Sequence, residues 1–300
     1  MPTLFLEIPK RFNLRRTLYS HGWSELLPFE IDEQNWRLTY VFSGAGLPRP
    51  AAATVSQHDE SKLKIDVLGG ADKLSSKAEA KILRDARHIL RLDDDLEEFY
   101  RLAASEKDLE WIARTNAGRL VRSPTVFEDL VKTLCTTNCN WAMTKKMTAN
   151  LVEKLGEPDD SGLRRAFPTA AAMANQPVEF YKNEIRAGYR APYFKELAEK
   201  VAAGALNPEA WLNSDLPTRE LRREMKRVKG VGDYAADNLL KLAGRYDGLA
   251  LDSWLRAQFY RTYNEAKPCE DKLIERHYER FGRWRGLVIW CEMTRRWLDD

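Results

Sequence analysis

Hydrophobic and polar residues alternate along residues 36–42 and 62–68, and residues 4–8 form a further short strand candidate. The stretch at residues 36–42 is also rich in aromatic and β-branched side chains, which strands favour. Such alternation is typical of an antiparallel sheet with one covered face. Residues 44–50 combine two glycines with two prolines and predict a break between strands.

The apolar spacing changes to a helical period from about residue 74 onward. Residues 78–92 repeat apolar side chains near the helical period, which predicts one buried face. Ser123 followed by Pro124 predicts a helix start, with the serine as cap and the proline in the first turn. Thr218 is expected to cap a later helix. Further helices are expected over residues 144–155, 169–175, 191–203 and 219–228.

These patterns predict an α+β protein, with an N-terminal antiparallel β-sheet domain at residues 1–92 and a mainly α-helical domain at residues 93–300. Hydrophobic residues make up 44% of the chain, too many for a disordered one. No apolar run approaches the roughly 18 residues that cross a bilayer, and no secretory signal is apparent. We therefore expect no membrane contact.

The charges almost cancel, but they are unevenly distributed. The chain has 48 Lys and Arg against 45 Asp and Glu, a net charge of +3. Residues 1–100 carry a net charge of −2, and residues 101–300 carry +5. Six basic and two acidic residues lie within positions 219–229. Charge alone leaves two interpretations open, a solvated helix face or a surface that binds phosphates.

The four cysteines do not have the spacing of a metal site. Cys135, Cys139, Cys269 and Cys291 form no Cys-x-x-Cys motif, and the few histidines are not clustered beside them. A zinc site or an iron–sulfur cluster is therefore not expected. Scattered thiols indicate a reducing compartment, so we expect the protein in the cytoplasm.

The most informative stretch is residues 225–240, where one helix ends, Gly230-Val231-Gly232 makes a tight turn and a second helix begins. Glycines allow a positive φ angle and close approach of the backbone to another surface. The first N–H groups of the second helix lack intrahelical partners, and the helix dipole is positive there. Such an end can bind phosphate, although a ligand-free helix turn would use the same residues.

Twenty residues after Gly232, an apolar run ends in Asp252 and is followed by Ser253-Trp254. Two interpretations of the aspartate are open. It can simply cap the next helix, because Asp is a favoured N-cap residue. It can also be a carboxylate held near a hairpin that binds phosphates.

Together, the hairpin and Asp252 resemble the helix–hairpin–helix (HhH-GPD) superfamily of DNA glycosylases. Over about residues 118–293 the chain resembles the branch of 8-oxoguanine and bacterial 3-methyladenine II DNA glycosylases. Residues 134–140 are similar to that branch's Cys-Ser-Ser-Asn-Asn-Asn run, and residues 188–193 to its Gly-Tyr-Arg-Ala-x-Tyr segment. The resemblance implies a two-lobed glycosylase domain with its hairpin motif near residues 219–244.

The resemblance also implies roles for single residues. Asp252 corresponds to the catalytic aspartate, and Asn138 to the residue that enters the duplex opposite the extruded nucleotide. Tyr189 and Arg190 correspond to residues that wedge into DNA and contact the opposite strand. The DNA backbone is then expected at the hairpin, whose carbonyls can hold a monovalent cation. The hairpin contacts are expected from Lys229, Gly230, Val231, Gly232 and Asp233.

The departures from the branch concern mechanism. Members with lyase activity carry a Lys two residues after the second hairpin glycine, and this chain has Tyr234 there. Tyrosine cannot form an imine, so we expect a monofunctional enzyme that needs no organic cofactor and stops at the abasic site. A bifunctional enzyme that uses another Lys, such as Lys226 or Lys229, remains an alternative.

The expected base pocket also departs from the branch. Asn238 stands at the position of the pocket cysteine, Gly286 at that of the base-reading glutamine, and Met143 at that of the arginine opposite cytosine. Tyr234, Trp254 and Trp290 form an expected aromatic box. Electron-rich rings favour cationic guests, so the box favours alkylated purines without excluding oxidised or deaminated ones.

The sequence therefore predicts a monofunctional DNA glycosylase of base excision repair. It would flip a damaged, alkylated or oxidised, purine out of double-stranded DNA and hydrolyse its N-glycosidic bond with Asp252. A non-catalytic protein that binds damaged DNA is the alternative from another class. We expect a monomer associated with a bacterial nucleoid.

Overall fold

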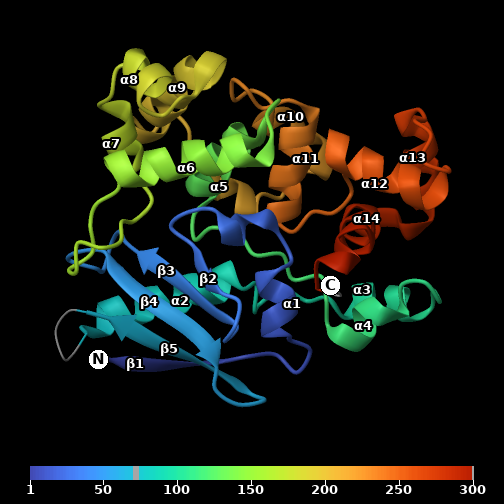
Figure 1. Ribbon diagram of the computed structural model, residues 1–300, viewed down its shortest axis with the longest axis horizontal. Helices are drawn as coiled ribbons and strands as arrows, with labels where there is room; N and C mark the ends of the chain where they lie inside the picture. The colour runs from blue at the N-terminus through green and yellow to red at the C-terminus, as the bar shows by residue number, and fades with distance from the viewer. Residues whose placement is uncertain (70–73, 299–300) are drawn as a thin grey trace. The chain divides into compact units, whose positions relative to one another are not determined.

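The computed structural model describes residues 1–69 and 74–298, whose helices and strands are labelled in Figure 1. Its packing divides the chain into two compact units. The first unit combines residues 1–93 with residues 119–209. The second combines residues 94–118 with residues 210–300. Both units therefore draw on two separate stretches of sequence.

An antiparallel sheet forms the N-terminal part of the first unit, as predicted, but it has five strands where the sequence indicated three, since β2 was also not expected. Its strand order is β1-β5-β4-β3-β2. The central strand β4 was not expected, because its alanines give a weak strand signal. Pairing with β3 on one side and β5 on the other holds it in place. The strands are β1 (Thr3–Glu7), β2 (Glu30–Asp32), β3 (Arg37–Phe42), β4 (Ala51–Gln57) and β5 (Lys62–Leu68).

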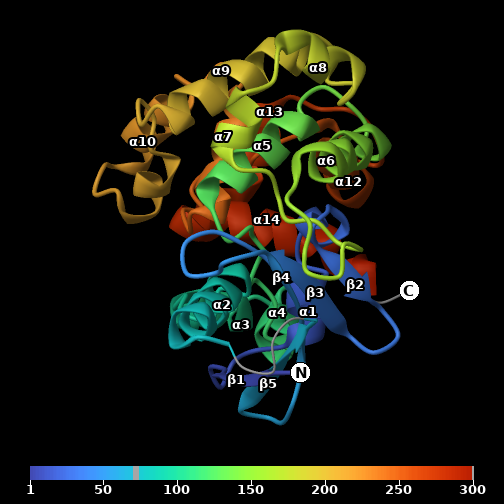
Figure 2. The ribbon, with the colours of Figure 1, turned by 90° about the vertical axis from the view of Figure 1, so that its left-hand side faces the viewer.

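One face of the sheet is buried in the expected alternating pattern. Leu63, Ile65 and Val67 of β5 are buried, whereas the residues between them are partly exposed. Helix α2 (Ser76–Ile89) runs beside the sheet in both views (Figures 1 and 2). Ser75 caps this helix, and Ile82 and Ile89 are buried along its inner face.

Helix α5 (Val126–Thr136) begins later than the sequence suggested, so the predicted cap was wrong. The cap is Thr125, whose hydroxyl accepts a hydrogen bond from the amide of Glu128 at 3.2 Å. The carboxylate of Glu209 accepts hydrogen bonds from the amides of Val126 and Phe127, each at 3.0 Å. Ser123 instead donates its amide to Asp129 at 2.8 Å. Thr125 and Glu128 have the Thr-x-x-Glu spacing of a capping box, which gives the first amides of the helix hydrogen-bond acceptors. The Ser123-Pro124 pair does not provide such an acceptor here.

Buried polar groups connect α5 to the sheet region. The Tyr40 hydroxyl donates to Glu128 at 2.7 Å, and the Lys132 ammonium lies 2.7 Å from the other oxygen of that carboxylate. The Trp23 indole donates to Asp129 at 2.7 Å. Burial raises the pKa of Asp129 to about 7 against these hydrogen bonds. The network satisfies polar groups that would otherwise be costly to bury.

The remaining helices of the first unit follow the predicted order with shifted ends. Asn140 caps α6 through the amide of Met143 at 2.9 Å. The other α-helices of this unit are α1 (Leu14–Leu18), α6 (Trp141–Leu155), α7 (Ala170–Ala174), α8 (Val178–Asn183) and α9 (Ala191–Ala202). Short 3-10 turns are η1 (Gly22–Glu25) and η2 (Gly188–Arg190), and η3 (Pro208–Asn213) leads into the second unit.

The second unit is helical. Its elements are α3 (Glu97–Ala104), α4 (Glu110–Thr115), α10 (Thr218–Met225), α11 (Asp233–Leu242), α12 (Ser253–Tyr263), α13 (Asp271–Tyr278), η4 (Glu279–Trp284), α14 (Arg285–Thr294) and η5 (Arg295–Leu298). The predicted cap at Thr218 was wrong, because α10 already begins at Thr218 and Pro217 stands at the N-cap position without a side-chain cap bond. The Thr218 hydroxyl donates to Asp247 at 3.1 Å. Among the described residues, no helix is long and apolar enough to cross a bilayer.

Candidate active site

The predicted hairpin is present in the second unit between α10 and α11. Gly230 has a φ of +92°, a conformation that residues with a side chain rarely adopt. Gly232 is the extended N-cap of α11, and no atom lies within 4 Å of where its Cβ would be. Gly232 itself has no side chain with which to cap α11. This end can therefore accept a phosphate at close range.

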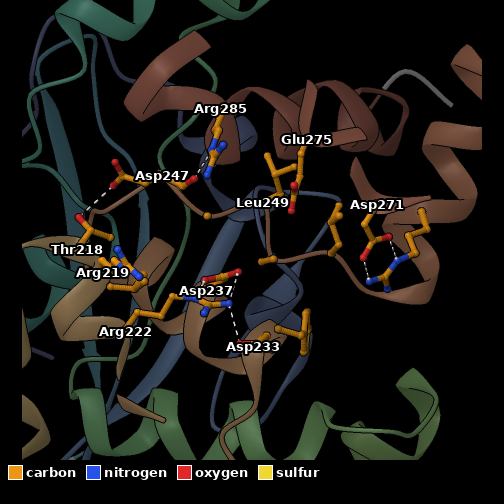
Figure 3. A pocket seen from close by; sticks show the side chains of 16 residues that line it. Thr218, Arg219, Arg222, Asp233, Asp237, Asp247, Leu249, Asp271, Glu275 and Arg285 are labelled. Carbon is orange, nitrogen blue, oxygen red and sulfur yellow. Dashed lines mark hydrogen bonds and ion pairs between the residues drawn. The ribbon is translucent and has the colours of Figure 1, made fainter. Parts of the chain in front are cut away.

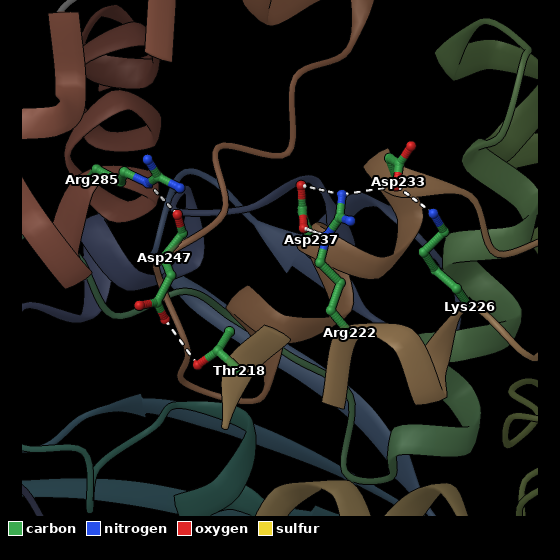
Figure 4. Close-up of polar contacts among 7 residues, drawn as sticks. All are labelled: Thr218, Arg222, Lys226, Asp233, Asp237, Asp247 and Arg285. Atoms are coloured by element: carbon green, nitrogen blue, oxygen red, sulfur yellow. Dashed lines mark hydrogen bonds and ion pairs between the residues drawn. The ribbon is translucent and has the colours of Figure 1, made fainter. Parts of the chain in front are cut away.

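The charged side chains of the hairpin are paired with one another (Figure 4). Lys226 lies 2.6 Å from the Asp233 carboxylate, and the Arg222 guanidinium reaches Asp233 at 3.0 Å and Asp237 at 3.3 Å. The hydrogen bond from Lys226 lowers the pKa of Asp233. Part of the basic cluster read from the sequence is thus paired with carboxylates of the same hairpin, and the exposed Asp233 carboxylate stands at the start of α11.

A pocket of about 510 Å³ lies beside these ion pairs (Figure 3). Tyr234 and Asp237 of α11 line it, together with four arginines and four further carboxylates. Asn238 and Lys241 are not among its lining residues. Because its charges oppose and pair with one another, this pocket does not resemble a site for an uncharged, flat base.

The loop that carries Asp252 packs closely against α11 and α14, and glycines make this close approach possible. A Cβ on Gly248 would lie 2.7 Å from the side chain of Asp237 in α11. A Cβ on Gly286 in α14 would lie 2.0 Å from the Gly248 carbonyl oxygen. The Gly286 amide donates to Tyr246 at 2.8 Å. Gly286 therefore allows close packing of this loop against α14, because no side chain fits at this position.

Asp252 caps helix α12, as one of the two interpretations of the sequence predicted. One carboxylate oxygen, Oδ1, accepts the Leu255 amide at 2.7 Å. The other oxygen, Oδ2, accepts no hydrogen bond from the described residues. Two residues earlier, Ala250 is buried with a φ of +52°, a strained conformation for alanine. The cap fixes the carboxylate and leaves one oxygen for a ligand.

Three tryptophans come together near this loop, and the sequence indicated two of them. The ring centroids of Trp254 and Trp290 lie 6.2 Å apart. Trp297 of η5 completes the group, at 5.7 Å from Trp254 and 5.8 Å from Trp290. Trp297 was missed because it lies beyond the stretch that resembles the family. Tyr234, the third expected aromatic, lines the charged pocket described above.

Two polar side chains on one face of α11 are buried. Asn238 is 3% exposed, and its amide nitrogen has no hydrogen-bond partner among the described residues. Lys241, one turn further on, is 1% exposed, and its ammonium lies 4.6 Å from the centroid of the Trp290 ring. Burial lowers the pKa of Lys241 to about 8, while Asp252, Asp237 and Cys291 act in the opposite direction. The sequence offered no reason to single out Lys241.

The residues expected to enter or contact the duplex lie in the first unit. Asn138, with a φ of +46°, donates its side-chain amide to the Tyr189 hydroxyl at 3.1 Å. Both side chains are exposed. Arg190 is instead buried and donates to the Thr137 hydroxyl at 3.1 Å, with its guanidinium over the Tyr189 ring. Arg190 therefore holds the turn that presents the other two, and Met143 lies exposed on α6.

Comparisons with known proteins agree with this fold. The chain is 25% identical over 179 residues to an N-glycosylase/DNA lyase of Saccharomyces cerevisiae, and it spans about half the length of that relative. A 3-methyladenine DNA glycosylase from Archaeoglobus fulgidus has a similar structure, with a TM-score of 0.77, 20% identity and 99% of each chain covered.

An 8-oxoguanine glycosylase/lyase from Clostridium acetobutylicum, solved with DNA, superposes with a TM-score of 0.73 and 19% identity. The alignment covers 96% of this chain and 93% of that one. A family model, the HhH-GPD superfamily base excision DNA repair protein, matches residues 131–287 and confirms the resemblance seen in the sequence. This match extends over more than half of the chain, which therefore belongs to the HhH-GPD superfamily of base excision DNA repair proteins.

Proposed function

We propose that this protein is a monofunctional DNA glycosylase that removes a damaged purine from duplex DNA and leaves an abasic site. The observation that carries the proposal is the state of Asp252. Its Oδ1 is fixed by the start of α12, and its Oδ2 accepts no hydrogen bond from the described residues. A fixed carboxylate with one available oxygen suits the stabilisation of a developing positive charge.

The proposed reaction begins with extrusion of the damaged nucleotide, because its sugar carbon cannot be reached within the duplex. Asn138 and Tyr189, exposed and bonded to each other, are suited to fill the gap. The open amides of α11 at Gly232 would hold a backbone phosphate. The solved complex of the Clostridium acetobutylicum glycosylase/lyase with DNA supports a duplex as partner.

Asp252 would act as the bond between the base and the sugar breaks. Positive charge then grows on the deoxyribose, and the Oδ2 atom of Asp252 would stabilise it. The same oxygen would orient the attacking water and accept its proton. Water forms the new bond to the sugar carbon, and the base leaves with the electrons of the broken bond.

The absence of a strand-cleavage step is proposed because Tyr234 occupies the position of the family's imine-forming Lys. A phenol cannot form an imine with the sugar. Strand breaks should therefore appear only after alkali opens the abasic site. A lyase that uses a different Lys would instead cut without alkali and could be trapped on DNA with borohydride.

The test uses duplexes with one hypoxanthine, 7-methylguanine or 8-oxoguanine, and compares the wild type with Asp252→Asn. We expect base release by the wild type, breaks only after alkali, and excision at least about a hundredfold slower in the variant. Lys267→Met, on an exposed side chain of the same unit, is the matched control. Full activity of Asp252→Asn would refute the catalytic role. Tight binding without release of any base would favour the non-catalytic alternative.

A further inference from the structure

The backbone that leads into Asp252 is strained at Ala250. This alanine is 3% exposed and has a φ of +52°, in the left-handed region that residues other than glycine rarely adopt. Such a conformation is unfavourable and persists only where the surrounding structure holds it. Asp252 lies two residues further on and caps α12 with its Oδ1 atom. The contacts that hold the loop at Ala250 therefore also fix the position of the Asp252 carboxylate.

Arg285, the first residue of α14, holds the same loop by its main chain (Figures 3 and 4). Its Nε atom donates a hydrogen bond to the carbonyl oxygen of Asp247. The Asp247 carboxylate accepts the hydroxyl of Thr218 at 3.1 Å, so both the main chain and the side chain of this residue are held. A carbonyl in a loop has no partner in a helix or sheet, and a charged donor to it stabilises one path of the loop.

Helices α11 and α14 leave the adjoining residue, Gly248, little room. The carboxyl group of Asp237 in α11 packs against it, and a Cβ on Gly248 would lie 2.7 Å from that group. A Cβ on Gly286 in α14 would lie 2.0 Å from the Gly248 carbonyl oxygen. With Gly248 confined, the hydrogen bond from Arg285 fixes where the chain enters the strained segment. The residues that follow, up to Asp252, then have few alternative paths.

We propose that Arg285 is a positioning residue for the proposed glycosylase. Its hydrogen bond to Asp247 keeps Ala250 in its strained conformation, and that conformation presents the Asp252 carboxylate to the sugar. The inference rests on the proposed function, because it assigns Arg285 to the reaction that Asp252 would perform. Arg285 acts through the loop and not on the duplex, so its loss should slow the chemical step and leave DNA affinity unchanged. A displacement of a catalytic group by about 1 Å can slow a reaction about a hundredfold.

The decisive experiment measures single-turnover excision with the protein in excess, on the lesion that the wild type releases fastest. Arg285→Met is compared with its parent in two backgrounds, the wild type and Ala250→Gly. Glycine adopts a positive φ at no steric cost, so the loop needs less support in the second background. We expect Arg285→Met to slow excision at least about tenfold in the wild type and at most about threefold in Ala250→Gly.

The comparison of the two backgrounds separates positioning from other roles of the arginine. An equal loss in both would overturn the proposal, because Arg285 would then act independently of the strain. Weaker duplex binding with a log–log salt slope reduced by about 1 would also overturn it, because Arg285 would then contact a phosphate. If Arg285→Met does not fold, Arg285→Lys is used instead in both backgrounds and the same comparison decides.

Arg280→Met is the matched control, since Arg280 is an exposed arginine of η4 in the same unit. It should change neither excision nor duplex affinity by more than about twofold. Thermal unfolding monitored by circular dichroism verifies that every variant is folded at the temperature of the assay.

Failure of the proposed function is recognised separately, as release of no base from any duplex. In that case hydrogen exchange followed by mass spectrometry decides the inference, because the Leu255 amide at the start of α12 donates to Asp252. Arg285→Met should speed exchange there at least about fivefold, and by less in the Ala250→Gly background. Unchanged exchange, or an equal increase in both backgrounds, would refute the positioning role.

Discussion

Replacement of Lys241 by methionine should stabilise the folded protein, and by an amount that depends on pH. Lys241 is buried, and its pKa falls from 10.5 to about 8 because the folded protein desolvates the ammonium. A pKa that differs by one between the folded and the unfolded protein corresponds to about 1.4 kcal/mol between the two protonation states. Methionine has a similar length, carries no charge and can keep the contact with Trp290.

The sign of the effect follows from proton binding in the two states. Between pH 8 and pH 10.5 the unfolded chain holds the Lys241 proton more often than the folded protein does. Wild-type stability therefore gains from this group as pH rises. At pH 7 both states are protonated and the folded protein carries the full desolvation cost, about 3 kcal/mol. At pH 9.5 roughly half of this cost remains.

The measurement is urea unfolding of the wild type and Lys241→Met at pH 7 and pH 9.5, followed by circular dichroism. Loss of the contact between the ammonium and the ring offsets about 1 kcal/mol of the gain. We therefore expect the variant to be about 2 kcal/mol more stable at pH 7 and nearly equal to the wild type at pH 9.5. Lys267→Met, whose side chain is exposed, should show no difference at either pH.

A stability difference that is the same at both pH values would refute the reasoning. It would mean that Lys241 titrates like an exposed lysine, and that its burial against Trp290 does not occur in solution. Loss of stability in Lys241→Met at pH 7 would be equally damaging, because it would show that the ammonium contributes more through its contacts than it loses by desolvation.

Three further predictions concern the fold and the hairpin. Lys132→Met leaves the Glu128 carboxylate buried without its cation and should lower the free energy of unfolding by about 3–5 kcal/mol. Adding Glu128→Gln should restore part of that stability. Unchanged stability of Lys132→Met in a urea titration would refute the prediction. Gly230→Ala forces alanine to a φ of +92° and should lower both the melting temperature and duplex affinity, whereas Gly232→Ala, in open space, should affect chiefly duplex affinity. Asp233→Asn removes a carboxylate from the start of α11 and frees two cationic side chains, so duplex binding should tighten several-fold and the log–log salt slope should steepen by about 1. Weaker binding by that variant in a salt titration would contradict the charge argument.

The sheet and the hairpin could be predicted because their signals are local. The alternation in residues 62–68 indicates which side chains of β5 are buried. Gly230 indicates the turn, because glycine readily adopts the positive φ angle that the turn requires. Strand β4 could not be predicted this way. Ala51, Ala52 and Ala53 have little preference for strands, and their conformation depends on partners distant in the sequence.

The start of α5 shows how two local signals compete. Ser123 and Thr125 are both favoured cap residues, and only Thr125 has a Glu three positions on. The contribution of Glu209 to the same helix start is a long-range contact with no local signature. The presence of helix α5 could therefore be predicted, whereas its first residue could not.

The aromatic part of the site was predictable only in part. Trp254 and Trp290 follow from the resemblance to the family, whereas Trp297 lies outside it and joins them through the packing of η5. Lys241 gave no signal because a Lys in the last turn of a helix usually interacts with the free carbonyls there. Which face of α11 is buried depends on tertiary packing.

Lys241 and Asn238 are two buried polar side chains on one face of α11. Buried polar groups in folded proteins normally find hydrogen-bond partners, and buried lysines are rare without compensation. The Lys241 ammonium is held over the Trp290 ring, and the negative charge of Asp252 favours its protonated form against desolvation. The Asn238 amide nitrogen, one turn earlier, has no hydrogen-bond partner among the described residues. A desolvated charge and an unsatisfied buried amide on one helix both lower stability, so the gain expected from Lys241→Met comes from removing a desolvation cost rather than from a new contact.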